Sequence, residues 1–128
     1  MRSSGLEANL IERVLMRASQ INGCAYCMDV HSKDARAGGE AEQRLYVLPA
    51  WREATFYSER ERAALAWCKA VTRLDGHGVS DEVYAQARAQ FSEKELGDLN
   101  MAVVLINAWN RIAMPFHSVP GSYQPATH

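Results

Sequence analysis

Helix-start signals recur along this chain, and no stretch of it alternates apolar with polar residues as a half-buried strand would. Ser58-x-x-Glu61 and Ser92-x-x-Glu95 match the capping box, in which a hydroxyl and a carboxylate each accept a hydrogen bond from a free backbone N–H at a helix start. Ser80, followed by an aspartate, offers a further start. These signals predict an all-α fold of about six helices, and the short connections favour antiparallel neighbours.

Caps, glycines and prolines set the limits of the expected helices. The expected helices are Leu6–Ser19, Cys24–Ala37, Glu40–Leu48, one from Glu59 to the turn at residues 75–78, Asp81–Gln90 and Glu93–Ala113. The last of them is apolar nearly all round, which indicates a central or interface helix. We expect the three tryptophans to lie in the core, because large aromatic side chains are more often core residues than cofactor contacts.

The length of 128 residues favours one domain, which we place at residues 1–114, with an irregular tail at 115–128 that holds three prolines. A hydrophobic fraction of 48% and a charged fraction of 23% are globular and argue against disorder. The net charge of −1 gives no footprint for nucleic acid or an anionic membrane. The longest apolar run, residues 101–106, is too short to span a bilayer, and no signal peptide is evident, so we expect a cytoplasmic protein.

A cysteine pair and a histidine share one face of the expected second helix. At 100° per residue, Cys24, Cys27 and His31 fall together on the side that carries Ala35. Both cysteines lie at the start of the helix, where free backbone N–H groups and the helix dipole favour a thiolate over a thiol. His31 lies one turn beyond Cys27, close enough to exchange a proton with it.

Glu12 on the preceding helix is expected to complete this group. It lies seven residues before Ser19, and His31 lies seven residues after Cys24, so each side chain sits about 10 Å from the connecting turn. An antiparallel helical hairpin would bring the two side chains level with each other. The sequence therefore predicts a carboxylate, an imidazole and a thiol in series, beside a second thiol.

The spacing Glu12-x11-Cys24-x2-Cys27-x3-His31, led by Ile-Asn-Gly and followed by Asp-Ala-Arg, resembles the alkylhydroperoxidase D-like (AhpD-like) branch of the carboxymuconolactone decarboxylase superfamily. The similarity runs from about residue 10 to residue 114. It implies an all-helical, oligomeric protein that needs no cofactor. Tyr26 departs from the pattern, because the best-characterised peroxidase of the branch has a histidine between its cysteines.

The resemblance implies a role for each residue of the motif. Cys27 is the peroxidatic cysteine that attacks a peroxide, and Cys24 resolves the product as a disulfide. His31 and Glu12 relay protons. The implied partners are a peroxide substrate and a dithiol reductant, for which a lipoylated protein is the best-known donor of the family.

Other interpretations stay open on the residues alone. Cys24, Cys27, His31 and Glu12 could together bind zinc in a non-catalytic helical module, although structural zinc usually draws on two separated ligand pairs. A decarboxylase is a second enzyme class, but such relatives usually lack the cysteine pair. Glu12 could instead pair with a neighbouring arginine, Arg13 or Arg17. Cys68 is expected to be a packed free thiol.

Overall fold

The protein is all-helical, as the capping signals predict. The computed structural model describes residues 5–126, so the outer ends of both expected segments, 1–4 and 127–128, lie outside the described residues. It contains α1 (Ala8–Asn22), α2 (Ala25–Ala37), α3 (Glu42–Tyr46), a 3-10 turn (Leu48–Ala50), α4 (Glu59–Thr72), α5 (Asp81–Gln90) and α6 (Glu93–Ala113). No strand occurs between residues 5 and 126. In this part of the chain no helix is long and apolar enough to cross a membrane.

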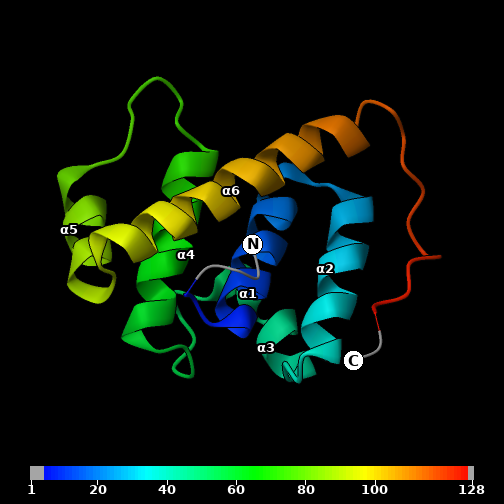
Figure 1. Ribbon diagram of the computed structural model, residues 1–128, viewed down its shortest axis with the longest axis horizontal. Helices are drawn as coiled ribbons and strands as arrows, with labels where there is room; N and C mark the ends of the chain where they lie inside the picture. The colour runs from blue at the N-terminus through cyan, green and yellow to red at the C-terminus, as the bar shows by residue number, and fades with distance from the viewer. Residues whose placement is uncertain (1–4, 127–128) are drawn as a thin grey trace.

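Helix α1 lies at the centre of the fold. It packs against α2, α4 and α6, and α6 runs diagonally across the molecule over the other helices (Figure 1). The main core joins apolar side chains of α1, α4 and α6 with Cys24 and Cys27 at the start of α2. The cysteine pair is therefore part of the hydrophobic core.

The helix starts at residues 59, 81 and 93 fall where the sequence predicts them. Ser58 and Ser92 each form the complete capping box with the glutamate three residues later. The Ser80 hydroxyl accepts a hydrogen bond from the backbone N–H of Val83 at 3.2 Å. Because these caps satisfy backbone donors locally, they fix the starts of α4, α5 and α6 whatever packs beside them.

The predicted end of the first helix at Ser19 is wrong. α1 continues through the expected turn to Asn22 and ends at Gly23, whose φ of 76° is left-handed. The N–H of Gly23 donates to the carbonyl of Gln20, and the N–H of Cys24 donates to the carbonyl of Ser19, which is the Schellman arrangement. Gly23 and Cys24 make the connection, so α2 follows α1 almost directly.

The third helix is shorter than expected. It spans Glu42–Tyr46 rather than Glu40–Leu48, because Glu40 is buried and its carboxylate bonds to arginine side chains. Pro49 does not end a helix there but lies in the first turn of Leu48–Ala50, where its missing N–H has no intrahelical partner to lose.

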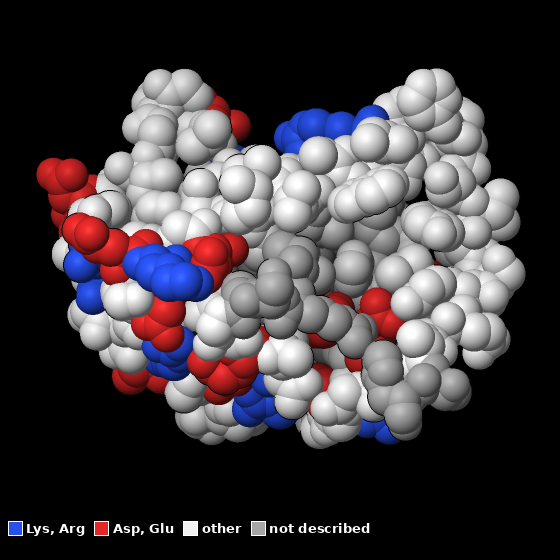
Figure 2. Space-filling view, viewed as in Figure 1, with Lys and Arg blue, Asp and Glu red and all other residues white. Residues whose placement is uncertain are grey.

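Helix α6 buries one face and exposes another. Leu99, Val103 and Ile106 are fully covered, whereas Trp109 is 61% exposed and contradicts the expectation that all three tryptophans are core residues. The surface over the C-terminal half of α6 is largely free of charged side chains (Figure 2). We call this surface the α6 apolar face; its members are Met101, Val104, Leu105, Trp109 and Ile112.

Residues 115–126, which we call the C-terminal strap, run beside α2 (Figure 1). The Lys33 ammonium donates to the carbonyls of Gly121 and Tyr123, both at 3.2 Å. The N–H of Gly121 donates to Asp29 at 3.0 Å, and the Tyr123 hydroxyl donates to Asp34 at 2.6 Å. The strap is therefore fixed to one face of α2 by hydrogen bonds.

Candidate active site

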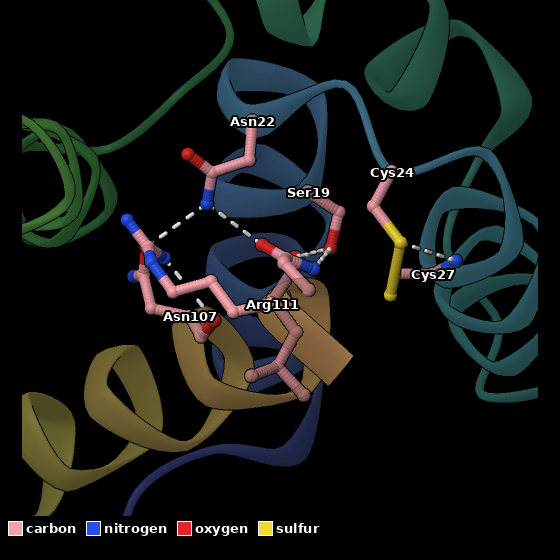
Figure 3. Close-up of a disulfide and its surroundings, with 8 residues drawn as sticks. Ser19, Asn22, Cys24, Cys27, Asn107 and Arg111 are labelled. Atoms are coloured by element: carbon pink, nitrogen blue, oxygen red, sulfur yellow. Dashed lines mark hydrogen bonds between the residues drawn. A yellow bond between two sulfur atoms is a disulfide. The ribbon is translucent and has the colours of Figure 1, made fainter. Parts of the chain in front are cut away.

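The two cysteines stand at the N-terminus of α2 and are joined by a disulfide (Figure 3). Cys24 is the N-cap, and its Sγ accepts a hydrogen bond from the backbone N–H of Cys27 at 3.3 Å. The side chains are almost covered, with 1% of Cys24 and 4% of Cys27 exposed. Both sulfurs lie at the N-terminus of α2, where the positive end of the helix dipole favours a thiolate once the disulfide is reduced.

A polar network holds the turn before Cys24 against α6 (Figure 3). The Asn22 amide donates to the side-chain oxygens of Asn107 and Asn110 at 2.9 and 2.8 Å. The Asn110 amide donates to the Ser19 hydroxyl at 3.2 Å, and Ser19 donates to the Leu15 carbonyl. Ser19 and Asn110 are fully buried. Since every member is hydrogen-bonded, the network fixes the approach of the chain to the disulfide.

Glu12 and His31 meet across the hairpin of α1 and α2. The Nδ1 of His31 lies 3.2 Å from the Glu12 carboxylate, and the two side chains are 18% and 19% exposed. The longer α1 and the two-residue connection still bring them level, so the predicted juxtaposition is observed. The pair forms part of the molecular surface, one helical turn from Cys27 along α2.

Arg13, beside Glu12 on α1, pairs with different carboxylates. Its guanidinium bonds Glu40, which follows α2, with the shortest contact at 2.6 Å, and also contacts Glu61 at the start of α4. Arg44 joins both of these carboxylates. Glu12 therefore pairs with His31 rather than with an adjacent arginine. The buried ion pairs of Arg13 connect the start of α1 to the segment that follows α2.

Asp34 belongs to the same cluster and was not predicted as a site residue. Ligand atoms of Glu12, His31 and Asp34 all lie within 4.8 Å of one another. The sequence signals for Asp34 are its place three residues after His31 and its part in the Asp-Ala-Arg segment of the family resemblance. Tyr123, which donates to Asp34, carried no sequence signal because it comes from the irregular strap.

Among the described residues, these three side chains lie close enough together to hold a metal ion. This cluster differs from the set considered from the sequence. Glu12 and His31 belong to both sets, but Cys24 and Cys27 are bonded to each other and offer no thiolate in this oxidised form. Asp34 stands in their place.

The third cysteine is chemically separate from the pair. Cys68 is fully buried in α4, and its thiol donates to the Val14 carbonyl at 3.6 Å. Burial raises the pKa of Cys68 to about 12, so it stays protonated at neutral pH. It is the packed free thiol that the sequence predicts.

The protein has an all-helical fold, a cysteine pair at a helix start and a histidine one turn later. These features assign it to a class of helical proteins related to enzymes. The model of the carboxymuconolactone decarboxylase family matches residues 1–70. The chain belongs to this family, in its AhpD-like branch. The uncharacterized protein YdfG of Bacillus subtilis is 42% identical over 113 residues, which cover 88% of this chain and 77% of YdfG.

Solved structures agree with this assignment. A protein of unknown function from Agrobacterium tumefaciens, for which antioxidant defence as AhpD has been suggested, is 43% identical, with a TM-score of 0.91 over 95% of this chain and 84% of that one. The debrominase Bmp8 is 22% identical, with a TM-score of 0.82 over 91% of this chain and 62% of its own. Bmp8 shares the fold and is a debrominase, so proteins of this fold need not catalyse a single reaction.

Proposed function

We propose that the protein is a thiol-dependent peroxidase that reduces an alkyl hydroperoxide or hydrogen peroxide. The observation that carries this proposal is the bonded pair Cys24 and Cys27 at the N-terminus of α2, one turn before a hydrogen-bonded His31 and Glu12. Paired cysteines at a helix start are typical of redox chemistry. A dithiol that can close into a disulfide inside the core needs no cofactor for two-electron reduction.

The proposed cycle balances with one peroxide and one external dithiol. The Cys27 thiolate attacks a peroxide oxygen, the O–O bond breaks, and an alcohol or water leaves with one added proton. Cys27 is then a sulfenic acid. The Cys24 sulfur attacks it, water leaves, and the disulfide forms. The dithiol donor transfers two electrons and two protons, which restores both thiols and leaves the donor oxidised.

His31 and Glu12 would move the protons of this cycle. The leaving alkoxide is a strong base, so a nearby proton donor lowers the cost of breaking the O–O bond. The Glu12 carboxylate at 3.2 Å from Nδ1 orients the imidazole and stabilises it when it carries the extra proton. Tyr26 stands between the cysteines, where the best-characterised peroxidase of the branch has a histidine, so the proposed relay rests on His31 and Glu12 alone.

We expect the electron donor to be a small or protein-bound dithiol, such as a lipoylated protein, in the cytoplasm. The net charge of −1 gives no reason to expect nucleic acid as a partner. A dithiol is favoured over a monothiol because its second sulfur completes the exchange within the mixed disulfide.

Comparison of single cysteine variants tests the proposal. With a dithiol donor in excess, Cys27→Ser should lose at least about 100-fold of peroxide consumption, since the attacking thiolate is gone. Cys68→Ser is the matched control, because its thiol is buried and protonated, and it should keep the parent rate. Mass spectrometry should show loss of two hydrogens in the peptide that holds Cys24 and Cys27 after peroxide. A Cys27→Ser protein with the parent rate would refute the proposal.

The two other interpretations predict different outcomes. A decarboxylase of a carboxylactone would turn over its substrate with both cysteines replaced by serine. A zinc-held module would release stoichiometric zinc from the reduced protein and would lose helicity when chelated. The disulfide favours the redox enzyme over both, because a bonded pair is one of the two states that the peroxidase cycle requires.

We also propose that the protein assembles with itself through the α6 apolar face. The exposed side chains there include Trp109 and Ile112, and the adjoining strap adds Phe116, which is 80% exposed. A contiguous apolar patch of this kind is typical of an interface. Trp109→Glu should therefore lower the sedimentation coefficient to that of a monomer. A parent protein that is already monomeric at micromolar concentration would contradict this.

A further inference from the structure

We propose that Glu12, His31 and Asp34 form a binding site for a divalent cation of the zinc type, and that the bound ion inhibits the protein. The second half of this statement rests on the proposed peroxidase activity; the binding itself does not. The site consists of one imidazole and two carboxylates from α1 and α2, at the surface end of the proposed proton path.

The spacing of the three side chains suits a small ion. Ligand atoms bound to zinc at about 2.0 to 2.1 Å in a tetrahedron lie roughly 3.3 Å from each other. The Nδ1 of His31 and the Glu12 carboxylate are already 3.2 Å apart. The third ligand atom lies within 4.8 Å of both, so Asp34 needs only a small side-chain movement to complete the set.

The ligand types select among metals. An imidazole with carboxylates suits zinc and similar first-row ions, whereas calcium and magnesium prefer oxygen ligands alone. Three protein ligands leave a fourth position for water, as in open zinc sites. The side chains of Glu12 and His31 are each about one-fifth exposed, so an ion can reach them from solvent.

The C-terminal strap competes with the ion for Asp34. The Tyr123 hydroxyl donates to Asp34 Oδ1 at 2.6 Å, so one of the two carboxylate oxygens that could bind an ion is already hydrogen-bonded. Moving Asp34 toward His31 would lengthen or break this hydrogen bond. The strap therefore lowers the affinity for the ion, and removing the Tyr123 hydroxyl should raise it.

The consequence for activity follows from the shared ligands. An ion bound to Nδ1 and to the Glu12 carboxylate takes the place of the proton between them. His31 then has no carboxylate to stabilise its protonated form, and the proposed relay stops. The ion acts as a reversible inhibitor rather than as a cofactor.

Calorimetric titration of Zn²⁺ into the oxidised, untagged protein tests the site. In this form Cys24 and Cys27 are bonded, so zinc binding by the thiols is excluded by the chemistry of the sample. We expect one site per chain. Asp34→Asn should weaken the affinity at least about tenfold, and Tyr123→Phe should strengthen it by severalfold. Asp98→Asn is the matched control, because Asp98 lies on α6 and pairs only with Lys94 among the described contacts.

Equal zinc affinity in the parent and Asp34→Asn proteins would overturn the proposed site, and so would binding that appears only after reduction. Circular dichroism of each variant verifies that it is folded before titration. The peroxidase proposal can fail separately. If the protein binds zinc through these residues but does not consume peroxide, the proposed zinc site stands and only the proposed inhibition is refuted. If the protein is a peroxidase and saturating zinc leaves its activity unchanged, the proposed inhibition is refuted as well.

Discussion

Replacing Glu40 by glutamine should destabilise the protein more than any other single change of a charged side chain to its amide. Glu40 is buried after the end of α2, and its two carboxylate oxygens face two arginines. Oε2 lies 2.6 Å from Arg13 and Oε1 lies 3.1 Å from Arg44. The amide of glutamine keeps the shape but removes the charge, so Arg13 and Arg44 each lose one of their two carboxylate partners.

The expected loss follows from this geometry. Two unit charges about 4 Å apart attract by roughly 4 kcal/mol at an effective dielectric of 20, and these contacts are closer. Removing one member of a buried pair typically costs about 3 to 5 kcal/mol. Arg13 and Arg44 both keep Glu61 as a second partner, which places the loss at the lower end. We expect about 3 kcal/mol, equivalent to a fall in Tm of roughly 10 °C for a chain of this size.

Urea unfolding followed by circular dichroism measures this loss as a shift of the midpoint at constant m value. Glu42→Gln is the matched control two residues away. Its side chain is 59% exposed and 3.7 Å from Arg36, so its loss should stay within about 0.5 kcal/mol. A loss below about 1 kcal/mol for Glu40→Gln, or equal losses in the two variants, would refute the argument that burial makes this ion pair important.

Two further predictions concern the strap and the polar network. The backbone N–H of Gly121, and then Lys33, lower the pKa of Asp29 below its ordinary value of 3.8. The hydrogen bond between Gly121 and Asp29 should therefore be complete above pH 3.8 and should be lost as the pH falls through the lowered pKa of Asp29. The amide resonance of Gly121 should report this loss by NMR. Release of the strap at pH 6 would contradict the prediction. Asn110→Ala should cost about 1 to 3 kcal/mol in urea unfolding, because buried Ser19 and half-buried Asn22 lose a partner.

The sequence predicts most of the helices because their signals are local. The serine caps at residues 58, 80 and 92 act within one turn, so the starts of α4, α5 and α6 needed no tertiary information. The observed end of α1 differs from the prediction because Gln20-Ile21-Asn22-Gly23 resembles a turn in composition. In the fold only Gly23 leaves the helix, and the Schellman bonds close α1 three residues later than expected.

The parts of the site that could not be predicted depend on contacts distant in sequence. Glu12 and His31 were found because helix geometry alone sets their level on a hairpin. The sequence predicts Glu40 within a helix, because its local sequence does not indicate its ion pairs with Arg13 and Arg44. Asp34 and Tyr123 meet through a hydrogen bond between residues 89 apart, and no periodic pattern links a helix to an irregular strap.

The cysteines, His31 and Glu12 all lie on the hairpin of α1 and α2. The burial of the two sulfurs affects peroxide attack and reduction by the dithiol, the two halves of the proposed cycle, to different degrees. Both sulfurs are nearly covered, with 1% and 4% of their residues exposed, so a small peroxide reaches them more easily than a dithiol carried on a protein. Forming the mixed disulfide requires Cys24 or Cys27 to emerge from the core, and Cys24 is the N-cap that holds the first turn of α2. Opening that turn breaks the N-cap hydrogen bond, which commonly contributes about 1 kcal/mol of stability, and also breaks core contacts. We therefore expect reduction, rather than peroxide attack, to depend on motion of the start of α2.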